Sequence, residues 1–256
     1  MNFQNIPSNL RTPLFYAEFD NSQANTATAT QRTLIIGQML TNAAVTPNVP
    51  VIESSASNTA GIYGAGSMLH NQMTAYLAND TSAEIYLLPL IDGASMVAAT
   101  GTITLTTAPS ETGVISLYVA GQRVQTTVLS TDTATTMATA LTAAINAAIA
   151  LPVTAASAAG VITLTAKNKG THGNSIDLRL NYLGSAGGEA TPDGLGITLT
   201  ALTGGAGAPD MTTALANLGY RTFDFIVTPY TDTTSLDALK SLLSDSTGRW
   251  SYASQL

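Results

Sequence analysis

Three glycines that precede a predicted helix are the first residues in this sequence that could bind a ligand. Gly61, Gly64 and Gly66 come just before an apolar helical stripe that begins at Met68. Glycines at the N-terminus of a helix let backbone amides approach a phosphate group, which the positive end of the helix dipole attracts. The Gly-x-Gly-x-x-Gly pattern is incomplete, however, because Leu69 stands at its third position. A tight turn and close helix contact therefore explain these glycines better than a nucleotide site does.

The segment from Asn168 to Asn174 is a second candidate, because it combines a lysine and a histidine with two glycines. Such a set could hold an anion. A connection between two strands explains it more simply, since Gly170 and Gly173 allow positive φ and the two asparagines tolerate turn conformations. The sequence thus favours a turn over an anion site.

Residues for metal or nucleophilic chemistry are sparse. The chain has no cysteine, and its only histidines, His70 and His172, each lack a second ligand at zinc spacing. No Gly-x-Ser-x-Gly motif marks a nucleophilic serine. Helix caps and solvated helix faces account for the aspartates near the C-terminal end, which are Asp224, Asp232, Asp237 and Asp245. We therefore predict no catalytic residue, no metal, no cofactor and no enzymatic activity.

The charge and composition of the chain limit the classes of partner that it could bind. Only 10% of its residues are charged, whereas an average globular protein has about 25%. Short neutral polar side chains lose little rotamer entropy when an interface orders them, so this surface suits dense protein–protein contact. A net charge of −7 with nine scattered basic residues argues against a nucleic-acid partner. A plain threonine-rich β protein would have the same composition.

No segment of the sequence predicts a membrane partner. The N-terminus lacks the apolar core of a signal peptide. The most apolar helical candidate, Ala138 to Leu151, is too short to span a bilayer.

Apolar periodicity divides the chain after about residue 30 into three blocks. In the first block, Arg32–Met39 and Ala83–Leu90 are predicted strands. The helix between them has an apolar stripe made of Met68, Leu69, Met73, Tyr76 and Leu77. Strand, helix and strand in this order are typical of a βαβ unit.

The third block, like the first, alternates predicted helices with a predicted strand. It predicts helices at Met211–Leu218 and Leu236–Leu243 around a strand at Phe223–Pro229. A capping box of Thr234 and Asp237 would begin the second helix. The leucines expected on one side of that helix are Leu236, Leu239, Leu242 and Leu243.

The middle block is rich in segments of period two, which predict antiparallel strands. These segments are Thr102–Thr106, Val114–Ala120, Arg123–Val128, Val161–Lys167, Ser175–Leu180 and Gly196–Thr200. One predicted helix interrupts them. It begins near Thr131, has Leu141, Ile145 and Ile149 on its apolar face, and stops at Pro152.

Together the blocks predict an α+β chain. An α/β domain built from the two ends of the chain is interrupted by an inserted β-rich module that contains one helix. The predicted boundaries are an extended arm at 1–30, an α/β core at 31–92 and 208–256, and the inserted module at 93–207. No strand follows the last helix, so we expect the α/β core to continue beyond residue 256.

The arm combines prolines with apolar side chains. Pro7 and Pro13 fix φ, lack an amide donor and favour extended neighbours. The apolar residues between and after them are Leu10, Leu14, Phe15, Tyr16 and Phe19. An extended apolar arm of this kind is expected to lie across its own domain or a neighbouring subunit.

This arm resembles the opening of the contractile tail sheath proteins of Mu-like bacteriophages. The residues that carry the resemblance are Ile6, Pro7, Arg11, Pro13, Phe15, Tyr16, Glu18 and Phe19. Later motifs add to it, namely Tyr63-Gly-Ala-Gly-Ser-Met-Leu69, Gly121-Gln-Arg-Val, Thr165-Ala-Lys-Asn-Lys-Gly170, Gly173-Asn-Ser-Ile-Asp-Leu-Arg179 and the run from Phe223 to Asp232. The similarity thus spans nearly the whole chain, although proteins of this family continue well past residue 256.

The resemblance implies a structural subunit that polymerises helically around a tail tube and contracts to drive the tube through the host envelope. It implies as partners further copies of the chain, a tail tube protein, and baseplate and tail terminator proteins. The subunit would be assembled in the host cytoplasm and would reside in the virion tail. By the same resemblance, the arm residues would join a neighbour's sheet by strand addition, and the inserted module would face outward.

Two other functions remain open from the sequence. The first is a surface β-module that binds a glycan or a protein partner. The missing signal peptide and an aromatic content of only 6% argue against it. The second is an α/β enzyme with an inserted lid, which lacks any convergent set of polar residues.

Overall fold

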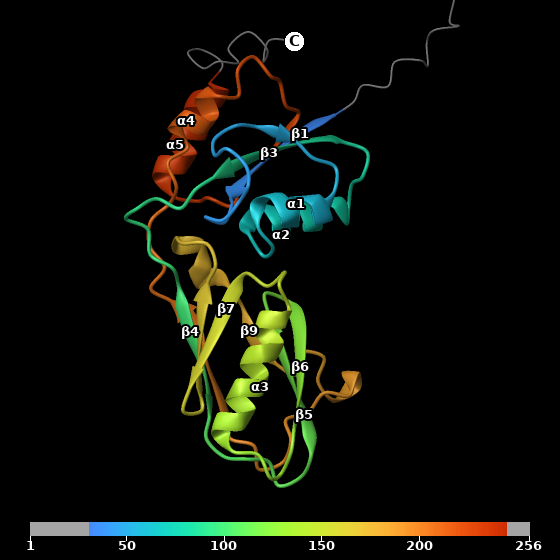
Figure 1. Cartoon of the computed structure of the whole chain (residues 1–256). Coiled ribbons are helices and arrows are strands. Elements are labelled where there is room, and N and C mark those ends of the chain that lie inside the picture. The colour runs from blue at the N-terminus through green and yellow to red at the C-terminus, as the bar shows by residue number, and fades with distance from the viewer. Residues whose placement is uncertain (1–30, 245–256) are drawn as a thin grey trace, which may run out of the picture.

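A computed structural model describes residues 31–244, which form two bodies lying one above the other in Figure 1. We call the first body the α/β unit (residues 31–92 and 208–244) and the second the inserted unit (residues 93–207). The predicted fold class is confirmed, because an α/β body formed by both ends of the described chain is interrupted by a β-rich body with one α-helix. The predicted arm residues lie outside the described range.

The α/β unit is built on a four-stranded sheet with the order β11-β1-β3-β2. Strand β1 pairs in parallel with both β3 and β11, and only β2 is antiparallel. The strands are β1 (Arg32–Gln38), β2 (Val51–Ile52), β3 (Glu84–Leu90) and β11 (Phe225–Val227). The helices are α1 (Ala56–Tyr63), α2 (Met68–Leu77), α4 (Thr212–Ala216) and α5 (Thr233–Leu243).

Helices cover both faces of this sheet, which explains why β1 and β3 read as unbroken apolar runs. Leu34 and Ile36 of β1 pack with residues of α4 and α5, whereas Ile35 between them packs with α1 and α2. Figure 1 shows the two helix pairs on opposite sides of the sheet, with α1 and α2 turned toward the inserted unit. The predicted strands and the helix at Met68 are thereby confirmed.

The end of the α/β unit differs from the sequence prediction in two details. Asp232, rather than a box of Thr234 and Asp237, caps α5 by accepting a hydrogen bond from the Ser235 amide at 2.9 Å. Of the four leucines expected on one side of α5, Leu239 and Leu242 are buried. The other two, Leu236 and Leu243, are about half exposed, at 46% and 53%.

The inserted unit consists of two antiparallel sheets and one long helix around a common core. The sheets have the orders β10-β4-β8-β7 and β6-β5-β9. The strands are β4 (Thr100–Leu105), β5 (Gly113–Val119), β6 (Gln122–Val128), β7 (Val153–Ala158), β8 (Val161–Ala166), β9 (Leu178–Leu180) and β10 (Ile197–Thr203). The helices are α3 (Ala134–Ala147) and two short 3-10 turns, η1 (Thr171–Ser175) and η2 (Ser185–Gly187).

Helix α3 confirms the predicted helix but ends earlier than the pattern suggested. A capping box of Thr133 and Thr136 starts it, and Leu141 and Ile145 lie in the core. Ile149, which was expected on the same apolar face, follows the end of the helix and is 64% exposed. Strand β7 was not predicted, because its sequence Val-Thr-Ala-Ala-Ser-Ala has only one large apolar side chain.

The apolar core of the described residues is divided between the two bodies. One buried cluster fills the inserted unit, and two others lie on the two faces of the α/β sheet. None of these three clusters contains residues of both units. No helix in the range 31–244 is long and apolar enough to cross a membrane.

Candidate functional site

The carboxyl ends of β1, β3 and β11 meet at the edge of the sheet where α/β proteins usually bind their ligands. Gln38, at the end of β1, is fully buried there. Its side-chain amide donates hydrogen bonds to Asp92 and to the Lys169 carbonyl oxygen, the latter at 2.9 Å. The Tyr230 hydroxyl donates to the Gln38 Oε1 at 3.3 Å. We call this place the crevice.

A loop of the inserted unit fills the crevice. Asn168 follows β8 and is buried, although it belongs to a connection between secondary-structure elements. Its Oδ1 accepts a hydrogen bond from the Met68 amide at 2.9 Å, and its Nδ2 donates to the Met39 carbonyl at 3.0 Å. The neighbouring Lys169 amide donates to Asp92 Oδ2 at 3.1 Å. The inserted unit is thus hydrogen-bonded to β1, to α2 and to the segment after β3.

Lys167 adds a further contact beside Asn168. Its Nζ donates to the carbonyl oxygens of Ala65 at 3.1 Å and Ile149 at 2.8 Å. The first oxygen precedes α2, and the second follows α3. Burial lowers the pKa of the Lys167 ammonium, because no charged partner compensates for its lost hydration. The ammonium therefore connects two backbone segments of different units and does not form an anion-binding site.

This occupation contradicts a phosphate site at the glycines before α2. The Met68 amide is bonded to Asn168, and the His70 amide is bonded to the Ser67 hydroxyl that caps the helix. The Gly66 amide donates to His70 Nδ1 at 3.1 Å. Burial first, and then the charge of Lys167, lower the pKa of His70, which favours the neutral ring that accepts this bond. Gly64 and Gly66 serve close contact, as the sequence analysis favoured, whereas Gly61 lies inside α1 with open space around it.

The remaining space near the crevice is small. A cavity of about 170 Å³ lies between α2 and the loop, and its walls include Gln72, Pro152 and His172. Small-molecule sites usually enclose about 300 to 1,000 Å³. Within residues 31–244, no group of three or more acidic or histidine side chains is placed to hold a metal ion. The crevice therefore supports contact between the two units better than it supports a small ligand.

The two segments singled out from the sequence thus meet in space. Both the glycines before α2 and the run that begins at Asn168 contribute to the crevice. Gln38 and Asp92 were not identified from the sequence. A polar residue at the end of an apolar run is the sequence signal that could have found Gln38.

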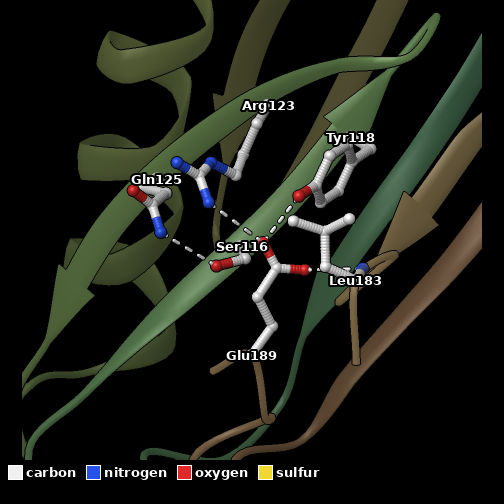
Figure 2. Close-up of polar contacts among 6 residues, drawn as sticks. All are labelled: Ser116, Tyr118, Arg123, Gln125, Leu183 and Glu189. Carbon is white, nitrogen blue, oxygen red and sulfur yellow. Dashed lines mark hydrogen bonds and ion pairs between the residues drawn. The ribbon is translucent and has the colours of Figure 1, made fainter. Parts of the chain in front are cut away.

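A second polar cluster lies in the inserted unit around Glu189, as Figure 2 shows. The carboxylate accepts hydrogen bonds from the Tyr118 hydroxyl at 2.6 Å and the Leu183 amide at 3.0 Å. Arg123 Nη1 lies 3.4 Å from the same carboxylate. In the same view, Gln125 Nε2 donates to the Ser116 hydroxyl at 3.2 Å. Glu189 is buried, and three groups donate hydrogen bonds to its carboxylate. It therefore anchors the loop that follows β9 rather than acting as a base.

This arrangement predicts a loss of stability in acid. Burial alone would raise the pKa of Glu189, but the bonds from Tyr118, Leu183 and Arg123 outweigh it and hold the pKa below the usual range. A depressed folded-state pKa stabilises the protein above the unfolded pKa, which is about 4.3 for glutamate, and this stabilisation disappears as the pH falls through the folded value. We expect Glu189→Gln to remove this part of the pH dependence.

Thermal unfolding midpoints recorded between neutral pH and about pH 3 would test this expectation. Glu111→Gln, at an exposed position, is the control because it changes the net charge equally. Glu189→Gln should lower the midpoint most at neutral pH and approach the unaltered protein in acid. Identical pH profiles for the two variants would contradict the prediction.

Comparisons with known proteins complete this description. No protein-family profile matches the chain. The chain is 37% identical over 258 aligned residues to the Mu-like prophage FluMu tail sheath protein of Haemophilus influenzae. The alignment covers 100% of this chain and 52% of that protein, so the chain spans about half the length of this curated relative. The resemblance predicted from the sequence motifs is thereby confirmed.

Among solved structures, the sheath tail protein Lin1278 from Listeria innocua matches with a TM-score of 0.29 and 14% identity. That match covers 85% of this chain and 46% of the other. A structural likeness at this level is too weak to support a functional inference.

Proposed function

Because the chain is related along its whole length to a Mu-like prophage tail sheath protein, we propose that it is a structural subunit of a phage contractile tail sheath. The 37% identity over the complete chain is the observation that carries this proposal. In this function the subunits polymerise helically around a tail tube, and contraction drives the tube through the host envelope. Contacts that repeat without closing generate such helical assemblies.

The interior of the described chain is consistent with a mechanical function. The crevice, where an α/β enzyme would bind its substrate, is filled by the chain's own Asn168 and Lys169. A chain in which only 10% of the residues are charged suits extensive contact between subunits. The energy for contraction would come from a metastable extended lattice, and no nucleotide or cofactor is part of the proposal.

We assign the contact between neighbouring subunits to the arm at residues 1–30. Its extended apolar sequence suits strand addition, in which main-chain hydrogen bonds supply affinity and side chains set the register. Strand β11 offers an edge of the required kind, since among the described strands it pairs with β1 alone. Phe225 on this edge strand is 52% exposed, so an added strand would also bury apolar surface.

The partners in this proposal are further copies of the chain, a tail tube protein, and baseplate and tail terminator proteins. The net charge of −7 argues against nucleic acid as a further partner. Assembly would take place in the host cytoplasm, and the product would be part of the virion tail. We further propose the domain boundaries 1–30, 31–92 with 208–256, and 93–207, with the inserted domain on the outside of the sheath.

Negative-stain electron microscopy tests this function directly. The purified protein would be imaged in dilute and in concentrated solution. We expect hollow tubes of sheath-like width in the concentrated solution. Dispersed globular particles in both solutions would contradict the sheath function and would favour a surface module that binds a glycan or a protein.

A further inference from the structure

Two linkers join the inserted unit to the α/β unit, and they are paired with each other. The Val97 amide donates to the Ala206 carbonyl at 3.0 Å, and the Ala206 amide donates back to the Val97 carbonyl at 3.1 Å. The loop after β8 joins this pair, because the Gly170 amide donates to Val97 at 3.0 Å and the Thr171 amide to Gly207 at 3.1 Å. The two covalent connections between the units therefore lie side by side at one place. By themselves they would leave the inserted unit free to rotate about that place.

A second attachment, beyond the paired linkers, lies at the crevice. Asn168 bonds to Met39 and Met68, and Lys167 bonds to Ala65. These three partners belong to the α/β unit but not to its linkers. Two attachments at different places prevent the rotation that one attachment would allow.

The attachment is polar in character. No buried apolar cluster contains residues of both units, so apolar burial inside those clusters does not set their relative orientation. Hydrogen bonds are directional and weaken steeply when their angle departs from linearity. Loss of one buried partner also leaves the other unsatisfied, and the desolvation of that group then costs free energy. Asn168 is the buried residue that makes two of these bonds at once.

We propose that the Asn168 side chain, supported by Lys167, is a clasp that locks the inserted unit onto the α/β unit and makes the two move as one rigid body. The side chain occupies the N-terminus of α2 at the carboxyl edge of the sheet, where other α/β proteins hold a ligand. The Asn168 side chain thus takes the place that a ligand would occupy. This inference concerns the single chain and holds whether or not the chain assembles into a sheath.

Distance measurements between spin labels on the two units test the clasp. The chain has no cysteine, so labels can be attached at Ala75→Cys in α2 and Thr127→Cys in β6 without background. Both positions are exposed. Asn168→Ala removes the two hydrogen bonds of the Asn168 side chain and leaves those of Lys167 and Lys169 in place. Asn146→Ala is the matched control, because Asn146 also makes two backbone hydrogen bonds, both to Ala155 within the inserted unit, at 2.8 and 2.9 Å.

We expect one narrow distance distribution for the parent chain and for Asn146→Ala, and a clearly broadened distribution for Asn168→Ala. Circular dichroism of the same samples would show that both units stay folded. Trypsin supplies a second measurement, because release of the loop would expose the bond after Lys169 and speed its cleavage in Asn168→Ala alone. A distribution as narrow as that of the parent, with unchanged cleavage after Lys169, would overturn the proposal.

Discussion

Deletion of residues 1–22 is expected to abolish tube formation by the proposed sheath subunit. The proposed arm would contribute main-chain hydrogen bonds and the aromatic side chains of Phe15, Tyr16 and Phe19 to a neighbouring subunit. Full burial of a phenylalanine side chain is worth about 2 kcal/mol, so the two phenylalanines alone correspond to about a thousandfold in affinity. A helical polymer repeats this loss at every subunit, and assembly should fail completely.

A shorter deletion provides the control for this prediction. Removal of residues 1–5 leaves Ile6, Pro7 and all later arm residues in place, and it should permit tubes. Electron microscopy and sedimentation would compare the two deletions with the unaltered protein. Normal tubes after removal of residues 1–22 would assign the subunit contact to another part of the chain.

Replacement of Gly66 by alanine is expected to destabilise the α/β unit by at least about 2 kcal/mol, because a non-glycine residue is strained in its backbone conformation. Gly66 has φ of +78°, a region that L side chains rarely adopt. An added Cβ would also overlap the Leu151 carbonyl oxygen and lie 2.5 Å from Lys167 Nζ. These atoms belong to the inserted unit, so relief of the overlap would push the two units apart.

Gly61 is the matched control in the same glycine-rich segment. It lies inside α1, and an added Cβ would meet nothing within 4 Å. Gly61→Ala should therefore stabilise the chain by about 0.5 to 1 kcal/mol, as alanine does in a helix interior. Urea unfolding followed by circular dichroism would measure both free energies of unfolding. A Gly66→Ala protein as stable as Gly61→Ala would show that this glycine is not required for close contact.

Much of the fold follows from the sequence because its signals are local. The alternating segments of the inserted unit have a period that a strand satisfies and a helix does not. The apolar runs of β1 and β3 are short, and their length favours buried strands. The errors arose where that signal was weak or misleading. Strand β7 is held by its pairing with β8 rather than by its own side chains. Ile149 continues the spacing of α3 in sequence, but the helix has already ended at Ala147.

For the candidate site, too, local features could be predicted from the sequence and long-range contacts could not. The sequence by itself determined the relationship to tail sheath proteins, the two-part architecture and the preference for a tight turn over a nucleotide site before α2, since these depend on motifs and short spacings. Only the tertiary structure decided that Asn168 contacts Met68 and Met39, which lie 100 and 129 residues away along the chain. Local periodicity carries no information about such partners. The residues next to an asparagine do not tell whether its side chain is buried against another element or lies in an exposed turn. The fold alone brings the carboxyl edge of the sheet to the loop that fills it.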